Sequence, residues 1–303
     1  MRTGVVGLGL IGGSLLRALG GTGYDADPAT RAAAAADGFE VAGALAGLAG
    51  CELVLVAVPP SRTAAVVEEV LATLPDALVA DTASVKALLP RHERLVGGHP
   101  MAGAETAGWA ASTAVLLQGA TWAACPAGEA LEPLLALSAV VDALGGRIVP
   151  CTPEDHDAAV ARTSHVPHLA AQALAGLAAE GGLHAALAGT AFRDMTRVAR
   201  ADPELWTEIL AANREACLLA MDELIARLGV LRSALGDDAA MGTEWALGHG
   251  WLERVDGARW HEPAWREEPV EGWAGLLEHG RAGRAVRRLR RDGERGLVAE
   301  VAR

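Results

Sequence analysis

Short apolar runs alternate with amphipathic segments through the first half of the chain. The pattern predicts buried strands over residues 3–8, 53–58, 77–81, 95–99, 121–124 and 147–150, and a shorter one ending at Asp25. Helices are predicted between strands, over residues 14–19, 61–74 and 131–144. Continuous apolar strands suit a parallel sheet covered on both faces, and their alternation with helices is typical of a doubly wound α/β domain. We therefore predict such a domain over residues 1–150.

The strand signal stops after about residue 152, and helical periodicity replaces it. A helical pattern covers residues 153–180, where Pro167 predicts a kink or break, and a longer one covers residues 203–235. In the second pattern apolar residues recur every seven positions, in two rows: Leu210, Cys217, Leu224 and Leu231, and Met221, Leu228 and Leu235. We expect an all-α domain over residues 151–303 whose apolar seam forms a homodimer interface.

Residues 236–303 carry five of the eight tryptophans and no clear periodicity. We expect an ordered appendage to the helical domain there, with a helix over residues 272–290 and a role that its sequence does not indicate. A cluster of arginines between Arg281 and Arg291 is interpreted as the charged face of that helix.

Composition excludes several classes of protein. The chain has 303 residues, a net charge of −12 and 51% hydrophobic residues, which is typical of a globular protein and unlike a nucleic-acid binder. No apolar run reaches 18 residues, so no membrane span is expected, and the glycine spacing near the N-terminus argues against a signal peptide. Four widely spaced cysteines fit a reducing compartment, which predicts a cytoplasmic protein.

A glycine-rich loop follows the first apolar run and precedes a helix. Gly7 permits a tight turn, Gly9 lets the backbone approach a pyrophosphate, and Gly12 lets the helix pack closely on the strand. Free N–H groups at a helix N-terminus also attract phosphates. The pattern predicts dinucleotide binding by Gly7, Gly9, Leu10, Ile11 and Gly12; the alternative is a helix packed tightly on the sheet without a nucleotide.

An acidic residue ends the second strand at Asp25, with Asp27 as the second candidate. A carboxylate at this position binds ribose hydroxyls and repels a 2′-phosphate, which favours NAD over NADP. The segment from the loop to Asp25 is shorter than the usual ~20 residues, so the first helix must be short.

Two further strand ends carry polar groups. Asp81-Thr82-Ala83-Ser84-Val85-Lys86 follows one strand, and Ser84 is a candidate partner of a catalytic side chain or of the nicotinamide. Lys86 is the only lysine of the chain, and the sequence leaves open whether it serves the site or is a surface charge. His99 follows the next strand, between glycines and a proline. Because histidine titrates near neutrality, we predict that His99 accepts a proton in catalysis.

The helical half contributes a second set of polar residues. Ser164-His165-Val166-Pro167-His168 places two histidines around a helix-breaking proline, which suits the wall of a substrate cleft. Their spacing alone does not support a metal site, and none is expected. Arg197 is suited to hold a carboxylate through two parallel hydrogen bonds, with Asp194 three residues earlier to orient it. The alternative is an internal salt bridge between the two.

Together these motifs resemble the prephenate/arogenate dehydrogenase family of tyrosine biosynthesis, over residues 4–235. The resemblance rests on Gly7-Leu8-Gly9-Leu10-Ile11-Gly12-Gly13-Ser14, Asp81-Thr82-Ala83-Ser84-Val85-Lys86, Gly98-His99-Pro100-Met101-Ala102-Gly103, Ser164-His165-Val166-Pro167-His168 and Phe192-Arg193-Asp194-Met195-Thr196-Arg197-Val198-Ala199. It implies a Rossmann-type domain followed by a helical dimerisation domain, with the active site between them. It also implies an NAD-dependent oxidative decarboxylation of prephenate or arogenate.

The resemblance assigns roles to individual residues. His99 would accept the proton of the substrate's ring hydroxyl, and Ser84 would hydrogen-bond near His99 and the nicotinamide. His168 and Arg197 would bind the substrate's carboxylates. Three other residues would lie nearby: His165, Asp194 and Trp206.

Two other functions remain open at this point. Another dehydrogenase with a helical domain, acting on a β-hydroxy acid or an imine, would share the glycine loop, but the β-hydroxy-acid type uses a lysine in the helical domain, which this chain lacks. A non-catalytic NAD-responsive protein would not need His99, Ser84 and Arg197 together. The choice between prephenate and arogenate also stays open, with Glu105 as the candidate that would recognise the ammonium group of arogenate.

Overall fold

A computed structural model describes residues 1–104, 106–179, 182–260, 263–293 and 296–302. Its described strands form one sheet in the order β3-β2-β1-β4-β5-β6-β7-β8-β10-β11-β9. The strands are β1 (Thr3–Val6), β2 (Thr22–Tyr24), β3 (Glu40–Val41), β4 (Leu53–Val56), β5 (Leu78–Asp81), β6 (Leu95–Pro100), β7 (Thr121–Pro126), β8 (Arg147–Pro150), β9 (Trp265–Val270), β10 (Val286–Asp292) and β11 (Gly296–Ala302).

The first six strands are parallel to one another in the order 3-2-1-4-5-6, which is the order of dinucleotide-binding sheets. β7 runs antiparallel to β6, and β8 runs parallel to β7. The predicted α/β domain is confirmed. Because β1, β4, β5 and β6 are parallel, the residues after each strand meet at one edge of the sheet. The glycine loop, Ser84 and His99 therefore share that edge.

Four helices connect or cover these strands: α1 (Leu10–Leu19), α2 (Pro28–Ala36), α3 (Pro60–Thr73) and α4 (Glu132–Ala143). Helix α1 begins four residues before the predicted position. Helix α2, which was not predicted, begins where the Asp27 carboxylate accepts hydrogen bonds from the backbone N–H groups of Ala29 and Thr30. Leu15, Leu16, Val67 and Leu137 are fully buried and join the helices to the sheet.

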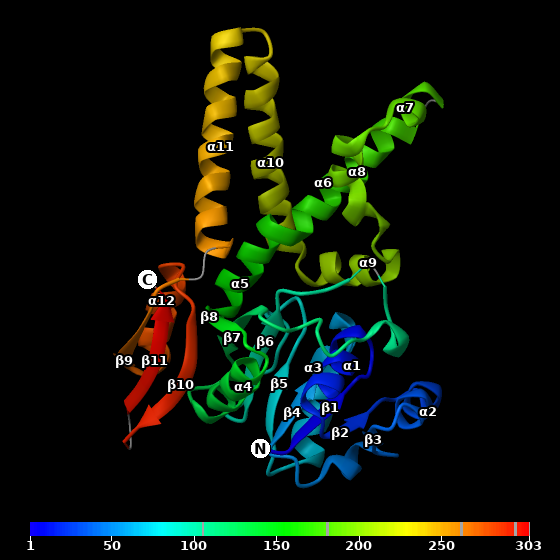
Figure 1. Cartoon of the computed structure of the whole chain (residues 1–303), viewed down its shortest axis with the longest axis vertical. Helices are drawn as coiled ribbons and strands as arrows, with labels where there is room; N and C mark the ends of the chain where they lie inside the picture. Colours follow the sequence, from blue (N-terminus) through cyan, green and yellow to red (C-terminus); the bar gives the residue numbers. More distant parts are fainter. Residues whose placement is uncertain (105, 180–181, 261–262, 294–295, 303) are drawn as a thin grey trace.

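The helical domain follows β8. Its helices are α5 (Pro153–Val160), α6 (Val166–Ala179), α7 (Gly182–Leu187), α8 (Thr190–Thr196), α9 (Pro203–Ala212), α10 (Arg214–Ala234) and α11 (Asp238–Trp260). Helices α10 and α11 pack side by side and project away from the sheet, and α6, α7 and α8 form a second projection (Figure 1). Figure 1 also shows α9 lying over the sheet domain, where Ser61 of α3 donates a hydrogen bond to Glu208.

Two helical predictions need correction. The pattern over residues 203–235 is two helices, because the chain turns at Asn213 between α9 and α10. The interruption predicted at Pro167 is a π-helical turn, Ala161–His165, that directly precedes α6. Pro167, the second residue of α6, has no backbone N–H to donate and directly follows this turn, in which the N–H of Val166 donates to the carbonyl of Ala161.

The tail returns to the sheet, contrary to the prediction that strands end after residue 152. β10 pairs with β8, and β11 and β9 continue the sheet beyond it. The helix predicted over residues 272–290 is α12 (Gly272–Arg281) and ends nine residues earlier. The arginine cluster therefore lies largely on a strand, not on a helix face. Val286 and Leu289 of β10 are buried, and Arg287 pairs with Glu300 on the neighbouring strand.

None of the described helices is both long and apolar enough to cross a membrane.

Candidate active site

The glycine loop between β1 and α1 has the geometry of a phosphate cradle. Gly7 has a φ of +86°, and a Cβ atom there would lie 2.4 Å from the carbonyl oxygen of Ala57. A Cβ atom on Gly12 would lie 1.8 Å from the carbonyl oxygen of Gly7, so α1 packs directly on the loop. A Cβ atom on Gly9 would meet nothing within 4 Å. Gly7 and Gly12 are thus required by packing, whereas Gly9 faces open space.

Gly9 is also the N-cap of α1, and no side chain caps this helix. The first N–H groups of α1 therefore remain available to an anion at the position that Gly9 leaves open. Leu10 and Ile11 are the first two residues of the helix and are only half-buried. The loop fits the pyrophosphate of a dinucleotide.

Asp25 lies directly after β2 and closes this loop. Its carboxylate accepts a hydrogen bond of 2.7 Å from the backbone N–H of Leu8 and one of 2.8 Å from that of Asp27. Asp27 is engaged separately as the N-cap of α2. Asp25 therefore lies beside the loop, whereas Asp27 caps α2. The contact of Asp25 with ribose stays a prediction.

His99 is the penultimate residue of β6 and contacts a residue of the helical domain. Its Nδ1 atom lies 2.9 Å from Nε2 of His156, on α5. Nδ1 of His156 lies 2.7 Å from the carboxylate of Asp157. That carboxylate also accepts hydrogen bonds from the backbone N–H groups of Lys86 and Ala87, each of 2.8 Å. Three side chains therefore form a line that ends at His99.

Lys86, whose backbone N–H donates to Asp157, forms an ion pair with Asp81 through its side chain. Both side chains are fully excluded from solvent. The Asp81 carboxylate also accepts hydrogen bonds from the backbone N–H groups of Ala83 and Gly98. The possibility that Lys86 is a surface charge is therefore wrong. The pair anchors the loop after β5 and the residue that precedes His99.

Ser84 lies in that anchored loop and is half-buried. Its neighbour Ala83 is bound by Asp81, and Lys86, two residues later, is bound by Asp157 through its backbone N–H. The loop is thus fixed on both sides of Ser84, at the sheet edge where β6 delivers His99. The role predicted for Ser84 stays a prediction.

A second cluster surrounds Trp206 of α9. The ring of His168 stacks on Trp206, with centroids 3.5 Å apart, and the ring of His165 meets it edge-on at 5.9 Å. His165 is buried, and its Nδ1 atom lies 3.2 Å from Nδ2 of Asn213. Asn213 in turn donates a hydrogen bond to the backbone carbonyl of Asp157. The Trp206 cluster is therefore connected to the line that holds His99.

The predicted pair Arg197 and Asp194 lies at the outer side of this cluster. Asp194 is on α8 and Arg197 begins the 3-10 turn that follows, and both side chains are exposed. Arg197 is close enough to His168 to disfavour its protonated form. Glu105 lies outside the described residues.

Burial disfavours the protonated form of three histidines of the site and so lowers their pKa values. Desolvation, together with the neighbouring His156, Lys86 and His165, holds the pKa of His99 well below its usual range. Burial likewise lowers the pKa of His165 to about 4 and lowers that of His168. The Asp157 pKa is lowered as well, because the hydrogen bonds from His156 and the backbone outweigh the opposing effect of burial. His99 is thus neutral at physiological pH, and His156 links it to a carboxylate that stays ionised.

Sequence analysis missed His156, Asp157 and Asn213. A His-Asp pair in the first helix after β8 was a usable signal, but its contact with His99 joins positions 57 residues apart. Asn213 is a polar residue between two helical segments, and that position was a second signal in the sequence.

Comparison with known proteins decides the family. Residues 15–150 match the family model of the nucleotide-binding domain of prephenate dehydrogenase, and residues 152–242 match the model of its dimerization domain. The chain belongs to the prephenate dehydrogenase family. This membership confirms the expected NAD-dependent dehydrogenase, with a Rossmann-type domain followed by a helical domain.

Similar proteins agree with this placement. A cyclohexadienyl dehydrogenase of Zymomonas mobilis is 35% identical over 202 residues, which span 61% of this chain and 68% of that protein. The crystal structure of Synechocystis arogenate dehydrogenase is 31% identical with a TM-score of 0.69, and the match covers 86% of this chain and 99% of that one. Prephenate dehydrogenase from Aquifex aeolicus, solved with hydroxyphenyl propionate and NAD+, is 26% identical with a TM-score of 0.74 and covers 84% and 98% of the two chains.

Proposed function

We propose that this prephenate dehydrogenase family member oxidises prephenate to 4-hydroxyphenylpyruvate, or arogenate to tyrosine, with His99 as the proton acceptor. The observation that carries the proposal is the position of His99. It lies at the carboxyl edge of the sheet, where the glycine loop offers its open cradle, and its Nδ1 atom is already engaged by His156. Nε2, the ring nitrogen on the side away from His156, is then available to a substrate hydroxyl.

The glycine loop and Asp25 would hold the cofactor in this arrangement. The N–H groups at the start of α1 bind the pyrophosphate, Gly9 provides the close approach, and Asp25 accepts hydrogen bonds from ribose hydroxyls. When bound, NAD supplies the acceptor for the hydride that leaves the substrate's ring carbon.

The side chains of the protein have a limited chemical task. His99 takes up the proton of the ring hydroxyl as the C–H bond to hydride breaks and the carbonyl group forms. The ring carboxylate then leaves as CO2, and the electron pair of the broken C–C bond moves through the ring to the ketone oxygen. The ring becomes aromatic and the oxygen becomes a phenolate. That phenol oxygen recovers the proton from His99, so protons and electrons balance. Aromatisation drives the reaction, and orientation is the main contribution of the site.

The second cluster would hold the anionic groups of the substrate. Arg197 is suited to bind a carboxylate in a bidentate manner, and His168 lies beside it on the face of Trp206. Asp194 would orient Arg197 from the same turn. His165 is buried against Asn213, so we propose that it supports the position of Trp206 and does not contact substrate.

Turnover with defined substrates tests the proposal. Purified protein is mixed with NAD and with prephenate or arogenate, NADH absorbance is followed, and the product is identified by mass spectrometry. We expect NADH and CO2 in equal amounts, with 4-hydroxyphenylpyruvate from prephenate or tyrosine from arogenate. NAD binding without turnover of either substrate would contradict the proposal and support a sensing role instead.

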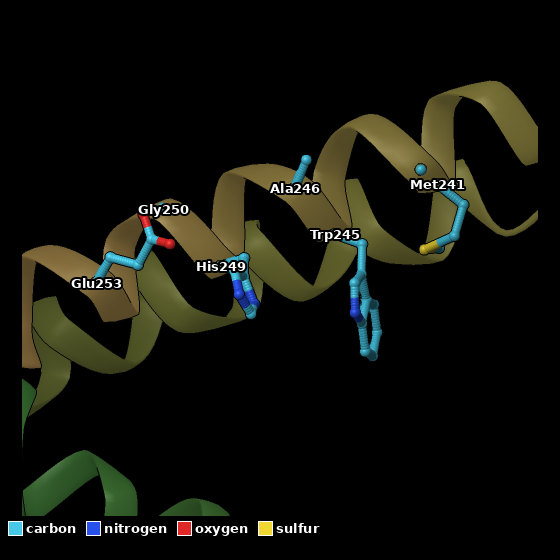
Figure 2. A pocket seen from close by; sticks show the side chains of 7 residues that line it. Met241, Trp245, Ala246, His249, Gly250 and Glu253 are labelled. Carbon is cyan, nitrogen blue, oxygen red and sulfur yellow. The ribbon is translucent and has the colours of Figure 1, made fainter.

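We also propose that the chain is a homodimer. The matched dimerization domain includes α10, and the apolar residues predicted to form a seam divide along that helix. Cys217, Met221 and Leu224 pack within the protomer, whereas Leu228 and Leu235 are 53% and 75% exposed. A shallow hollow on α11 adds Met241, Trp245 and His249, which project from one face of that helix (Figure 2). A second copy of the chain would cover this apolar surface. A cytoplasmic location stays a prediction.

A further inference from the structure

We infer that His156, oriented by Asp157, fixes the tautomer of His99 so that its Nε2 atom carries a free lone pair. His156 is thus a positioning residue, and the inference rests on the proposed role of His99 as proton acceptor. No motif of the sequence singled out this residue. Its assignment comes from two short contacts, 2.9 Å to His99 and 2.7 Å to Asp157.

The argument begins at the carboxylate. Asp157 already accepts hydrogen bonds from two backbone N–H groups, of Lys86 and Ala87. An ionised carboxylate has only acceptor sites, so the contact of 2.7 Å requires that Nδ1 of His156 carry the hydrogen. The backbone hydrogen bonds fix the Asp157 side chain in place, and it therefore determines the state of the ring next to it.

The direction of the next hydrogen bond follows. A neutral imidazole carries one hydrogen, so Nε2 of His156 is an acceptor once its Nδ1 is protonated. Nδ1 of His99 lies 2.9 Å from that acceptor and must donate to it. The single hydrogen of neutral His99 is then on Nδ1, and Nε2 is left as a base. The opposite tautomer would present N–H to the substrate hydroxyl and could not accept its proton.

The surroundings of His99 favour its neutral form. His156 is 3% exposed, and the rings of His99 and His156 meet at an interplanar angle of 68°. The charged and titratable groups that face His99 are His156 and Asp157 on α5, Lys86 after β5 and His165 before α6. A second proton on His99 would place a cation near Lys86. During the reaction, while His99 holds the proton of the ring hydroxyl, the cation is stabilised through His156 by the Asp157 carboxylate.

Two substitutions separate the two contacts of His156. In His156→Gln, the amide oxygen occupies about the position of Nε2 and still accepts a hydrogen bond from His99. In His156→Asn, the shorter side chain occupies the position of Nδ1, still faces Asp157 and has no atom near His99. If tautomer control matters, kcat falls by ~10²-fold or more in the Asn variant and by less than ~10-fold in the Gln variant, with KM changed only slightly. Equal losses in the two variants would contradict the inference.

A spectroscopic measurement tests the tautomer without turnover. The full-length protein, labelled with ¹⁵N at its nine histidines, is examined by long-range ¹H–¹⁵N correlation NMR at pH 7.5. Side-chain to backbone correlations assign the rings, and His184→Asn, at an exposed position of α7, is the matched control.

We expect Nδ1 protonated and Nε2 unprotonated on both His99 and His156. A hydrogen on Nε2 of His99, or an imidazolium at His156, would overturn the inference, even if neither His156 variant folds. Because no substrate is present, a failure of the proposed reaction would appear only in the turnover assay, and the two failures are distinguishable.

Discussion

Lys86 and Asp81 form an ion pair from which solvent is fully excluded, and the same Asp81 carboxylate binds the backbone N–H of Gly98, next to His99. The pair thus ties the loop after β5 to the end of β6. Burial raises the pKa of Asp81, while Lys86 and the backbone N–H groups oppose this effect. Removal of the lysine alone would leave a buried carboxylate without its cation.

We therefore predict that Lys86→Met lowers the free energy of unfolding by roughly 3–5 kcal/mol. The double variant Lys86→Met/Asp81→Asn recovers part of this loss, since the amide carries no charge. Chemical denaturation at fixed protein concentration measures both. Arg91→Met, at an exposed position of the same connection between β5 and β6, is the control and changes stability by less than about 0.5 kcal/mol. Equal effects of Lys86→Met and Arg91→Met would contradict the assignment of a structural ion pair.

Substitution of Gly9 and substitution of Gly12 in the cofactor loop are expected to have different effects. A Cβ on Gly9 enters open space, and its φ of −71° suits any residue. Gly9→Ala should therefore fold with a loss of at most about 1 kcal/mol, yet raise the Kd for NAD by at least ~10-fold. Gly12→Ala meets the Gly7 carbonyl oxygen and should lose about 1–3 kcal/mol or more of stability. Calorimetric titration measures the Kd for NAD, and thermal unfolding measures stability. A Gly9 variant with wild-type affinity for NAD would show that Gly9 does not contribute to the cofactor site.

The pH dependence of stability should report the burial of His165. In the unfolded chain this ring takes up a proton near pH 6.5, whereas in the folded protein it does so only near pH 4. Between these values the unfolded state binds more protons, so stability falls as the pH drops from 6.5 towards 4 and is unaffected above 6.5. The contribution of this residue over the whole range is about 3 kcal/mol.

His165→Gln checks that contribution. The variant is less stable at pH 7.5, because the contact with Asn213 is altered, but its free energy of unfolding depends less steeply on pH between 6.5 and 5. His184→Gln, at an exposed position, keeps the wild-type slope. The same slope in the His165 variant and the wild type would show that His165 titrates normally in the folded state.

The fold was predictable wherever hydrophobic periodicity is local. Strands such as 53–56 are apolar throughout, and the glycine loop marks the turn into α1. The tail was not predictable by this means. In β10 the many arginines hide the alternation of apolar and polar residues that marks a strand. Val286 and Leu289 are both buried, because a bulge shifts the register between them, and Arg287 pairs with Glu300 of β11.

Helix α11 was not predicted either, because its sequence also lacks a clear apolar periodicity. Its apolar residues include Trp245, Trp251 and Leu252, which are exposed in the single protomer and follow no single-face pattern. The site shows the same division between local and long-range signals. His99 and Ser84 follow recognisable strand ends, whereas the contact between His99 and His156 depends on how the two domains pack.

The exposed Leu228 on α10 gives a prediction about assembly. Leu228→Glu places a charge where a second copy of the chain is expected, so it should shift the protein from dimer to monomer at micromolar concentration. Ser233→Glu, on the same helix, is the control for added charge and should leave the dimer intact. Light scattering coupled to size-exclusion chromatography gives the mass directly. A monomeric wild-type protein at all concentrations would contradict the proposed interface.

The most direct test of the account is His99→Asn, assayed for NADH formation with the better of the two substrates, alongside NAD binding by titration. Asparagine keeps a polar group near His156 in place of Nδ1 and lacks the Nε2 base. The account predicts a fall in kcat of ~10²–10⁴-fold with the Kd for NAD within ~2-fold of wild type. A variant that binds NAD normally and retains turnover within a few-fold of wild type would show that His99 is not the proton acceptor.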